Sequence, residues 1–110
     1  MNLMQKIDIK EMHRGWFIGN FDPSVLKTDL FEVGILKHKK GENWPEHYHA
    51  EATEYNVLIE GSMSINGTFI KAGEIFVIQK NESSKPTFHD NCTIVCVKVP
   101  SIPGDKYEVF

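Results

Sequence analysis

The amino-acid sequence predicts an all-β protein whose strands form a barrel or a two-sheet sandwich. No long stretch carries the hydrophobic period of an amphipathic helix. Short runs rich in Val, Ile, Phe and Tyr instead recur between turn signals. Many short strands with regularly spaced turns are typical of sandwiches and barrels, and a small barrel leaves an interior wide enough for one small ligand.

The expected strands follow from these runs and from the turn residues between them. Asn66-Gly67 separates two runs, and this dipeptide tolerates the positive φ angles that a two-residue type I′ hairpin requires. Gly61 and Gly73 lie at strand boundaries, where a residue without Cβ permits a tight turn. The strands are expected at residues 14–18, 31–39, 46–49, 55–59, 62–65, 68–70, 75–78 and 93–99.

Two segments fall outside this regular pattern. Residues 20–29 contain an Asp-Pro-Ser sequence and are expected to form a loop with one helical turn. The chain beyond Pro100 breaks the strand pattern through its Ser, Pro and Gly residues. Tyr107, Val109 and Phe110 are nevertheless able to pack on the body of the protein or on a second subunit.

Length and composition predict one domain, covering residues 1–110, with no membrane or nucleic-acid partner. A chain of 110 residues is enough for one apolar core. Twelve basic and fifteen acidic residues give a net charge of −3, whereas nucleic-acid binders usually carry a basic surplus. The N-terminus lacks the apolar stretch of a signal peptide, and no segment reaches the length of a membrane span. We therefore expect a cytoplasmic protein.

The two cysteines are expected to be reduced. Cys92 and Cys96 lie in one predicted strand, where their Cα atoms would be about 13 Å apart. This separation exceeds the reach of a disulfide. We expect both thiols to face one side of the strand and to pack as small apolar groups.

The residues that indicate chemistry lie between Gly41 and Gly61. Side chains alternate along a strand, so His47 and His49 are expected on one face and Tyr48 on the other. Glu54 follows at the start of the next strand, where its carboxylate can return to the same point. Two imidazoles and one carboxylate suit Fe, Mn, Ni, Cu or Zn and leave coordination positions open.

This spacing resembles the first conserved motif of the cupin superfamily. In that motif a Gly is followed by His-x-His, then by a Glu and a second Gly, and residues Gly41, His47, His49, Glu54 and Gly61 fall in those places. The chain is similar to small single-domain (RmlC-like) cupins. The resemblance implies a double-stranded β-helix, or jelly-roll barrel, with His47, His49 and Glu54 as metal ligands.

The second cupin motif is degenerate. It begins at Gly73 and extends to about residue 89, but Gln79 and Asn81 depart from the usual Pro and Gly. Ser84 stands where the resemblance implies a fourth ligand, a histidine. His89 can replace it only if the loop over residues 81–86 bulges, and an exposed His89 is the alternative interpretation. Three ligands would make an open site, and complete loss of the metal stays an alternative.

The resemblance leaves the reaction open. Cupins include isomerases, epimerases, lyases and dioxygenases, and the fold does not choose among them. The first hypothesis is a metal-dependent enzyme acting on a small metabolite such as a sugar or a carboxylic acid. The second is a non-catalytic module that binds a small molecule or a metal. A third, metal-free hypothesis needs a His base paired with a carboxylate and a Tyr acid, a trio that the sequence alone does not reveal.

Other residues carry weaker predictions. Trp44 lines the barrel mouth or caps the core. Arg14, the only arginine, is either solvated or holds an anionic substrate by a bidentate contact. The resemblance to small cupins that pair through N-terminal strands implies a homodimer, and Trp16, Phe17 and Ile18 are the expected interface residues.

Overall fold

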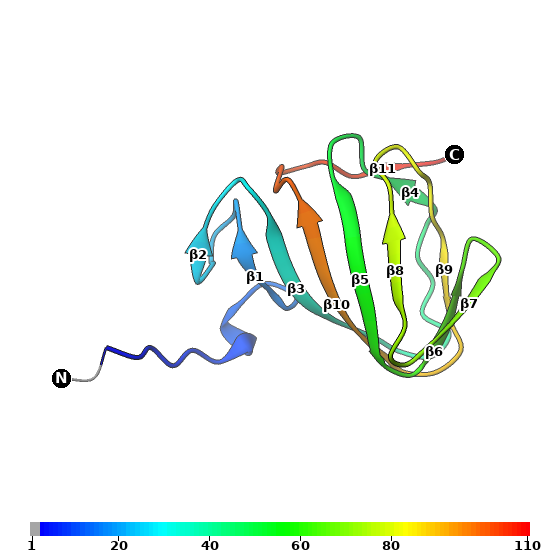
Figure 1. Ribbon diagram of the computed structural model, residues 1–110, viewed down its shortest axis with the longest axis horizontal. Helices are drawn as coiled ribbons and strands as arrows, with labels where there is room; N and C mark the ends of the chain where they lie inside the picture. The colour runs from blue at the N-terminus through cyan, green and yellow to red at the C-terminus, as the bar shows by residue number, and fades with distance from the viewer. Residues whose placement is uncertain (1–2) are drawn as a thin grey trace.

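A computed structural model describes residues 3–110, and almost all of its regular structure is β (Figure 1). The only helix in this part of the chain is a 3-10 turn, η1, Ile9–Glu11, which is capped by the Asp8 side chain. No helix among the described residues is long and apolar enough to cross a membrane. The strands are β1 Trp16–Gly19, β2 Leu26–Lys27, β3 Glu32–His38, β4 His47–Tyr48, β5 Thr53–Glu60, β6 Ser62–Ile65, β7 Thr68–Lys71, β8 Ile75–Ile78, β9 Pro86–Phe88, β10 Cys92–Val99 and β11 Tyr107–Glu108.

The strands form three sheets that surround one interior. The largest sheet has the order β2-β1-β3-β10-β5-β8, and a second has the order β7-β6-β9. A small third sheet pairs β11 with β4, so the C-terminal segment crosses one end of the barrel (Figure 1). All pairs are antiparallel except β1 with β2. This arrangement confirms the predicted all-β class.

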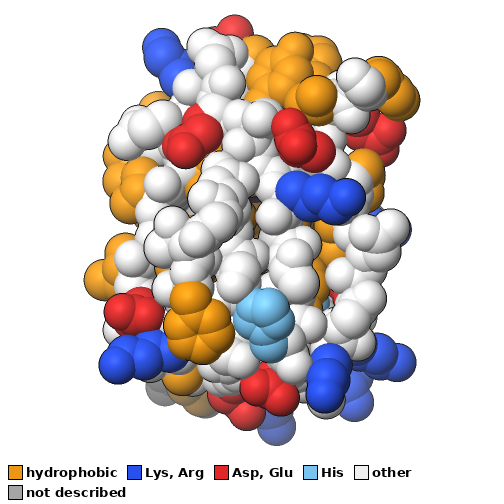
Figure 2. All heavy atoms as spheres, turned by 90° about the vertical axis from the view of Figure 1, so that its right-hand side faces the viewer, with side chains coloured by type: hydrophobic (Ala, Val, Ile, Leu, Met, Phe, Trp, Pro, Cys, Tyr) orange, Lys and Arg blue, Asp and Glu red, His pale blue; other side chains and the backbone are white. Residues whose placement is uncertain are grey.

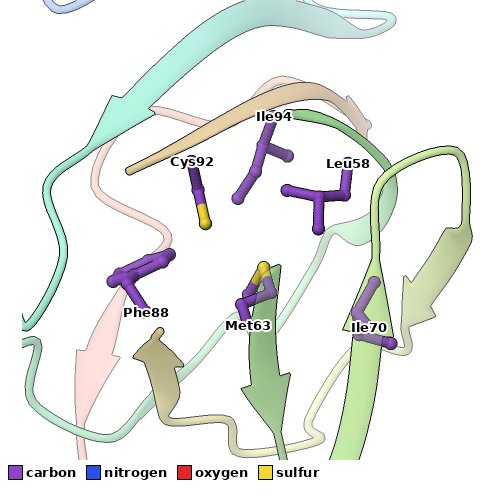
Figure 3. Close-up of a cluster of buried hydrophobic side chains, with 6 residues drawn as sticks. All are labelled: Leu58, Met63, Ile70, Phe88, Cys92 and Ile94. Atoms are coloured by element: carbon purple, nitrogen blue, oxygen red, sulfur yellow. The ribbon is translucent and has the colours of Figure 1, made fainter. Parts of the chain in front are cut away.

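The core lies between the large sheet and the β7-β6-β9 sheet. Even-numbered residues of β5 and β10 point inward, as the burial of Leu58, Ile94 and Cys96 shows. Figure 3 shows how the buried side chains of several strands converge on one cluster, with Met63 at its centre. The cluster consists of Leu58, Met63, Ile70, Phe88, Cys92 and Ile94. Burying such side chains supplies most of the favourable free energy of folding.

The hairpin between β6 and β7 has the predicted turn. Ile65 pairs with Thr68, which leaves a two-residue loop. Asn66 and Gly67 both have positive φ, at 50° and 79°, as a type I′ turn demands. On the side of the molecule formed around this hairpin, hydrophobic side chains lie in separate groups among polar and charged ones (Figure 2).

Three short strands were not expected from the sequence, and one expected turn is absent. Residues 20–29 contain no helical turn, because residues 26–27 pair with β1 as strand β2 instead. Strands β9 and β11 are also additional, and they are too short to show alternation in the sequence. Their positions depend on distant partners, since β9 pairs with β6 and β11 with β4.

The cysteines behave as predicted. Cys92 and Cys96 are free and buried on the inner face of β10. Burial raises the pKa of both thiols, so the neutral form predominates.

Candidate metal centre

The structure brings His47, His49 and Glu54 together at one end of the barrel. His47 lies in β4, His49 directly follows this strand, and Glu54 lies in β5. One ligand atom of each residue lies within 4.8 Å of the others, and the two imidazole rings stand nearly perpendicular, with centroids 5.3 Å apart. We refer to these three residues as the trio. Their geometry follows the alternation expected from the sequence.

His49 is held so that its Nε2 atom faces the carboxylate of Glu54. The side chain is buried, and its Nδ1 donates a hydrogen bond to the main-chain carbonyl of Asp105. The lone pair of a neutral ring therefore lies on Nε2. Nε2 is 2.7 Å from Glu54 Oε1, but it forms no aligned hydrogen bond with any described residue. Two acceptors facing each other at this distance need a cation between them, either a proton or a metal ion.

His47 also presents a free Nε2. Its Nδ1 lies 3.3 Å from the carbonyl oxygen of Pro45, which suits donation from Nδ1. Burial lowers the pKa of His47, and the nearby ammonium group of Lys106 lowers it further. The neutral imidazole, which is the form that binds a metal ion, is thereby favoured.

Glu54 is kept ionised in a buried position. Burial acts to raise the pKa of its carboxyl group, but contacts with His49 and the charge of Lys98 outweigh this effect and lower the pKa. Lys98 Nζ lies 3.8 Å from Glu54 Oε1, and the Asn56 side chain donates to the other carboxylate oxygen. The trio therefore fits a divalent ion, since it combines two imidazole nitrogens with one fixed carboxylate.

Asp105 organises the site from the C-terminal segment, and sequence reasoning did not identify it. Its carboxylate accepts hydrogen bonds from the main-chain N–H groups of Ala50, Glu51 and Ala52, which form the turn between His49 and β5. Its carbonyl also holds the His49 ring. One residue thus fixes the turn and orients a candidate ligand, as residues behind metal ligands commonly do. No local pattern links it to residues so far away in the sequence.

Ser84 and His89 occupy different places. Ser84 is buried and pairs with the backbone of His47 through two hydrogen bonds, so it lies beside the trio at the implied fourth position. His89 is not brought to the trio. The loop before it does not bulge toward the site, because residues 86–88 form β9 and carry His89 beyond that strand. There His89 is exposed, stacks on Phe69 and contacts Ser64 Oγ.

The trio opens into a cavity of about 950 Å³ that runs into the barrel. Two tryptophans line it, and Trp16 fits because Gly34 has no side chain: a Cβ there would lie 2.6 Å from the indole. Trp44 lines the cavity and also packs against the core. Tyr48 is not among the cavity-lining residues and stacks on Tyr107, in agreement with its predicted place on the other face of the strand.

A second polar group lies at the same cavity, which is lined by its His38 and Trp44 side chains. His38 Nδ1 and Trp44 Nε1 each lie 2.5 Å from the same carboxylate oxygen of Glu42, and the His38 ring stacks on Phe88. The hydrogen bonds from Trp44 and His38 lower the pKa of Glu42. Sequence reasoning missed this His–carboxylate pair, although its spacing of four residues was visible. His38 lies in the run Lys37-His38-Lys39-Lys40, where positive charge is the most visible feature of the sequence.

No family model and no curated protein matches the sequence. Solved structures do match. A double-stranded β-helix protein from Klebsiella pneumoniae is 18% identical with a TM-score of 0.71, over 97% of this chain and 93% of that one. A cupin-2 domain protein from Shewanella frigidimarina is 24% identical with a TM-score of 0.57, over 68% and 76%. The bacterial pirin YhhW from Escherichia coli, solved with nickel(II), is 17% identical with a TM-score of 0.66, over 80% of this chain but 39% of that one. These similarities show that the chain has the cupin double-stranded β-helix fold, as predicted.

Proposed function

We propose that this protein binds one divalent transition metal ion through His47, His49 and Glu54 and acts on a small metabolite in the cavity beside it. The observation that carries the proposal is the buried Nε2 of His49, which faces the Glu54 carboxylate without an aligned hydrogen bond. Iron, manganese, nickel, copper and zinc all suit this donor set. The nickel(II) in the structurally similar pirin supports a metal of this group.

The metal ion would supply Lewis-acid polarisation of a substrate oxygen at its open coordination positions. The residues of this chain provide the frame for that chemistry. Asp105 fixes the orientation of His49, and Lys98 with Asn56 fixes the Glu54 carboxylate. Aromatic and aliphatic side chains line much of the cavity beside the trio.

The test is metal analysis of the protein purified without added metal, with His47→Ala and His49→Ala as the site variants. His89→Ala is the matched control, because this histidine is exposed and lies away from the trio. We expect one ion per wild-type and control chain and a stoichiometry near zero in both site variants. A wild-type stoichiometry near zero, or one that His47→Ala leaves unaltered, would contradict the proposal.

The His38–Glu42 pair supports a second candidate function, metal-free acid–base catalysis. Glu42 holds Nδ1 of His38, which leaves Nε2 of this cavity-lining ring to accept or give a proton. Deuterium uptake from D₂O into candidate carboxylic acids or sugars distinguishes the metal-dependent function from the metal-free one. Exchange that continues after a chelator has removed the metal, but is lost in the His38→Gln variant, would favour this second function. Metal and ligand binding without any turnover would favour a non-catalytic binding module.

The expected homodimer is supported by an apolar outer face of the large sheet. Tyr55 pairs with Val77 and Val57 with Ile75, so these side chains share a face, and all but Val57 are largely exposed. Of the interface residues expected from the sequence, Trp16 also lines the cavity. Light scattering tests the dimer: Ile75→Lys should yield monomers, whereas Val25→Lys, at an exposed apolar residue elsewhere, should not. A monomeric wild type would refute it. Cytoplasmic location stays a prediction.

A further inference from the structure

The cavity beside the trio is lined by more positive charge than the composition suggests. The chain as a whole carries a net charge of −3. Of the described residues that line the cavity, however, Arg14, Lys37, Lys98 and Lys106 are basic and only Glu54 is acidic. A concentration of one sign of charge in a cavity attracts ligands of the opposite sign.

Lys98 reaches the site from the inner face of β10. Its Nζ lies 4.9 Å from the centroid of the Trp16 ring and 3.8 Å from Glu54 Oε1. The indole holds the ammonium group by a cation–π contact without neutralising it. Glu32 of β3 also interacts with Lys98: burial raises the pKa of its carboxyl group, while the charge of Lys98 and a hydrogen bond from Ser101 act to lower it. Among residues 3–110, no acceptor takes a hydrogen bond from Lys98 Nζ.

Lys106 lies on the C-terminal segment and also lines the cavity. Its Nζ lies 4.6 Å from the centroid of the Trp44 ring, and it too donates no hydrogen bond to a described residue. Burial lowers the pKa of Lys106, and the charges of Lys98 and Arg14 lower it further. The charges of Lys98 and Arg14 thus act unfavourably on the Lys106 ammonium group, and the carboxylates of Glu108 and Glu54 act in the opposite direction. An anion bound beside Lys106 and Lys98 would add to this favourable effect.

The remaining lining limits the kind of anion. Most of the other lining residues are apolar, and polar side chains such as those of His38, Asn56 and Thr93 are the minority that could bond to a sugar. The inner lining residues are Leu36, Met63, Ile65, Phe76, Phe88 and Ile94. An aliphatic or aromatic group would be buried favourably here, whereas each sugar hydroxyl would lose hydrogen bonds to water.

We propose that the cavity takes a small organic anion with an apolar body, whose carboxylate or phosphate lies between Lys98 and Lys106 beside the metal. This inference rests on the proposed function and specifies its substrate class. A divalent ion on the trio would engage the Glu54 carboxylate and leave Lys98 without its nearest partner. The loaded site would then hold several positive charges, which an anion would balance.

Calorimetric titration of the metal-loaded full chain tests this with matched probes. Benzoate carries both the charge and the apolar ring, benzyl alcohol only the ring, and acetate only the charge, while phenyl phosphate distinguishes phosphate from carboxylate. Lys106→Gln removes one cation, and Lys106→Arg retains it. Lys71→Gln is the control, because Lys71 is an exposed lysine on β7, outside the cavity lining.

We expect benzoate or phenyl phosphate to bind at least about tenfold more tightly than benzyl alcohol, since hydrogen bonds to charged groups are the stronger ones. Acetate should also bind more weakly than benzoate. Lys106→Gln should lower benzoate affinity about tenfold, while Lys106→Arg and Lys71→Gln should leave it nearly unchanged. Equal binding of benzyl alcohol and benzoate, unaltered affinity in Lys106→Gln, or no binding of any probe would overturn the inference.

Metal content measured in the same samples separates this inference from the proposed function. Protein that holds its metal but shows no preference for anions would refute the substrate class and leave the metal centre standing. Protein that holds no metal but binds benzoate through Lys106 would refute the metal centre and leave the substrate class standing.

Discussion

Two segments far apart in the sequence build the candidate site, and they contribute in different ways. Residues 41–61 supply the trio, whose spacing is readable in a single stretch of chain. Residues 101–110 supply no candidate ligand. They supply Asp105, Lys106 and the strand that pairs with β4. The first segment determines which atoms can meet a metal, and the second determines whether those atoms are held in place.

The identity of the candidate ligands and their orientation are therefore encoded in two separate segments of the chain. A carboxylate or imidazole is informative at its own position, whereas a main-chain carbonyl that orients it has no signature in the sequence. The C-terminal segment is also the less regular of the two, with only the two residues of β11 in a strand. If this interpretation is right, changes in residues 101–110 should damage the site as severely as changes near the ligands themselves.

The largest effect is expected for Asp105→Ala. The variant leaves the N–H groups of Ala50, Glu51 and Ala52 without their acceptor, which should cost roughly 3 kcal/mol of unfolding free energy. Metal affinity should fall by about 10- to 100-fold, because the turn before Glu54 is no longer fixed. Urea unfolding and competition with a chelating dye measure the two quantities.

Asp29→Ala is the control for this prediction, because it makes the same replacement at an exposed position. It should change neither the unfolding midpoint nor the metal affinity. Retention of full metal affinity in Asp105→Ala would break the comparison, since the trio would then need no support from the second segment.

An intermediate effect is expected for Ser84→His, which restores the ligand type implied at this place. Ser84 lies beside His47 through paired backbone hydrogen bonds, so a histidine there can reach the ion that the trio holds. Metal affinity should rise by about tenfold, equivalent to about 1.4 kcal/mol. The metal-free variant should lose about 1–3 kcal/mol of stability, because Ser84 is buried and the larger ring must be accommodated.

Ser83→His controls for a histidine added to the same loop, because Ser83 is not among the residues that line the cavity. Its metal affinity should match the wild type. Equal affinities for both variants and the wild type would show that the position beside His47 is not open to a fourth ligand.

The sequence was sufficient where the determining contacts are local. His47 and His49 share a face because strand side chains alternate, and Asn66-Gly67 forms its hairpin because two adjacent residues must adopt positive φ. Cys92 and Cys96 were expected on one buried face for the same reason as the histidines, and they lie there.

The sequence was insufficient where a partner lies far along the chain. Strand β11 exists because Tyr107 and Glu108 meet β4, and a two-residue strand shows no alternation of its own. Asp105 acts on a turn more than 50 residues earlier, and Lys106 acts through the indole of Trp44. The His38–Glu42 pair was the exception, since its spacing was local, whereas the place of His38 in the cavity depends on distant strands.

The smallest effect is expected at the two thiols, which report on the two ends of the barrel separately. Cys96 lies on β10 near Glu54, whose charge adds to burial in raising the thiol pKa, whereas Cys92 belongs to the core cluster. Because thiolates are the reactive form, alkylation of native protein should be slow at pH 8, and its rate should still be rising at a pH above the ordinary thiol pKa.

In Asp105→Ala we expect Cys96 to react somewhat faster and Cys92 to stay protected, since only the end of the barrel that holds the trio loses hydrogen bonds. Mass spectrometry of iodoacetamide-treated protein assigns the rates, with Cys92→Ser and Cys96→Ser as controls. Equal acceleration at both thiols would mean that the barrel opens as one unit, so that residues 101–110 stabilise the whole fold rather than the site alone.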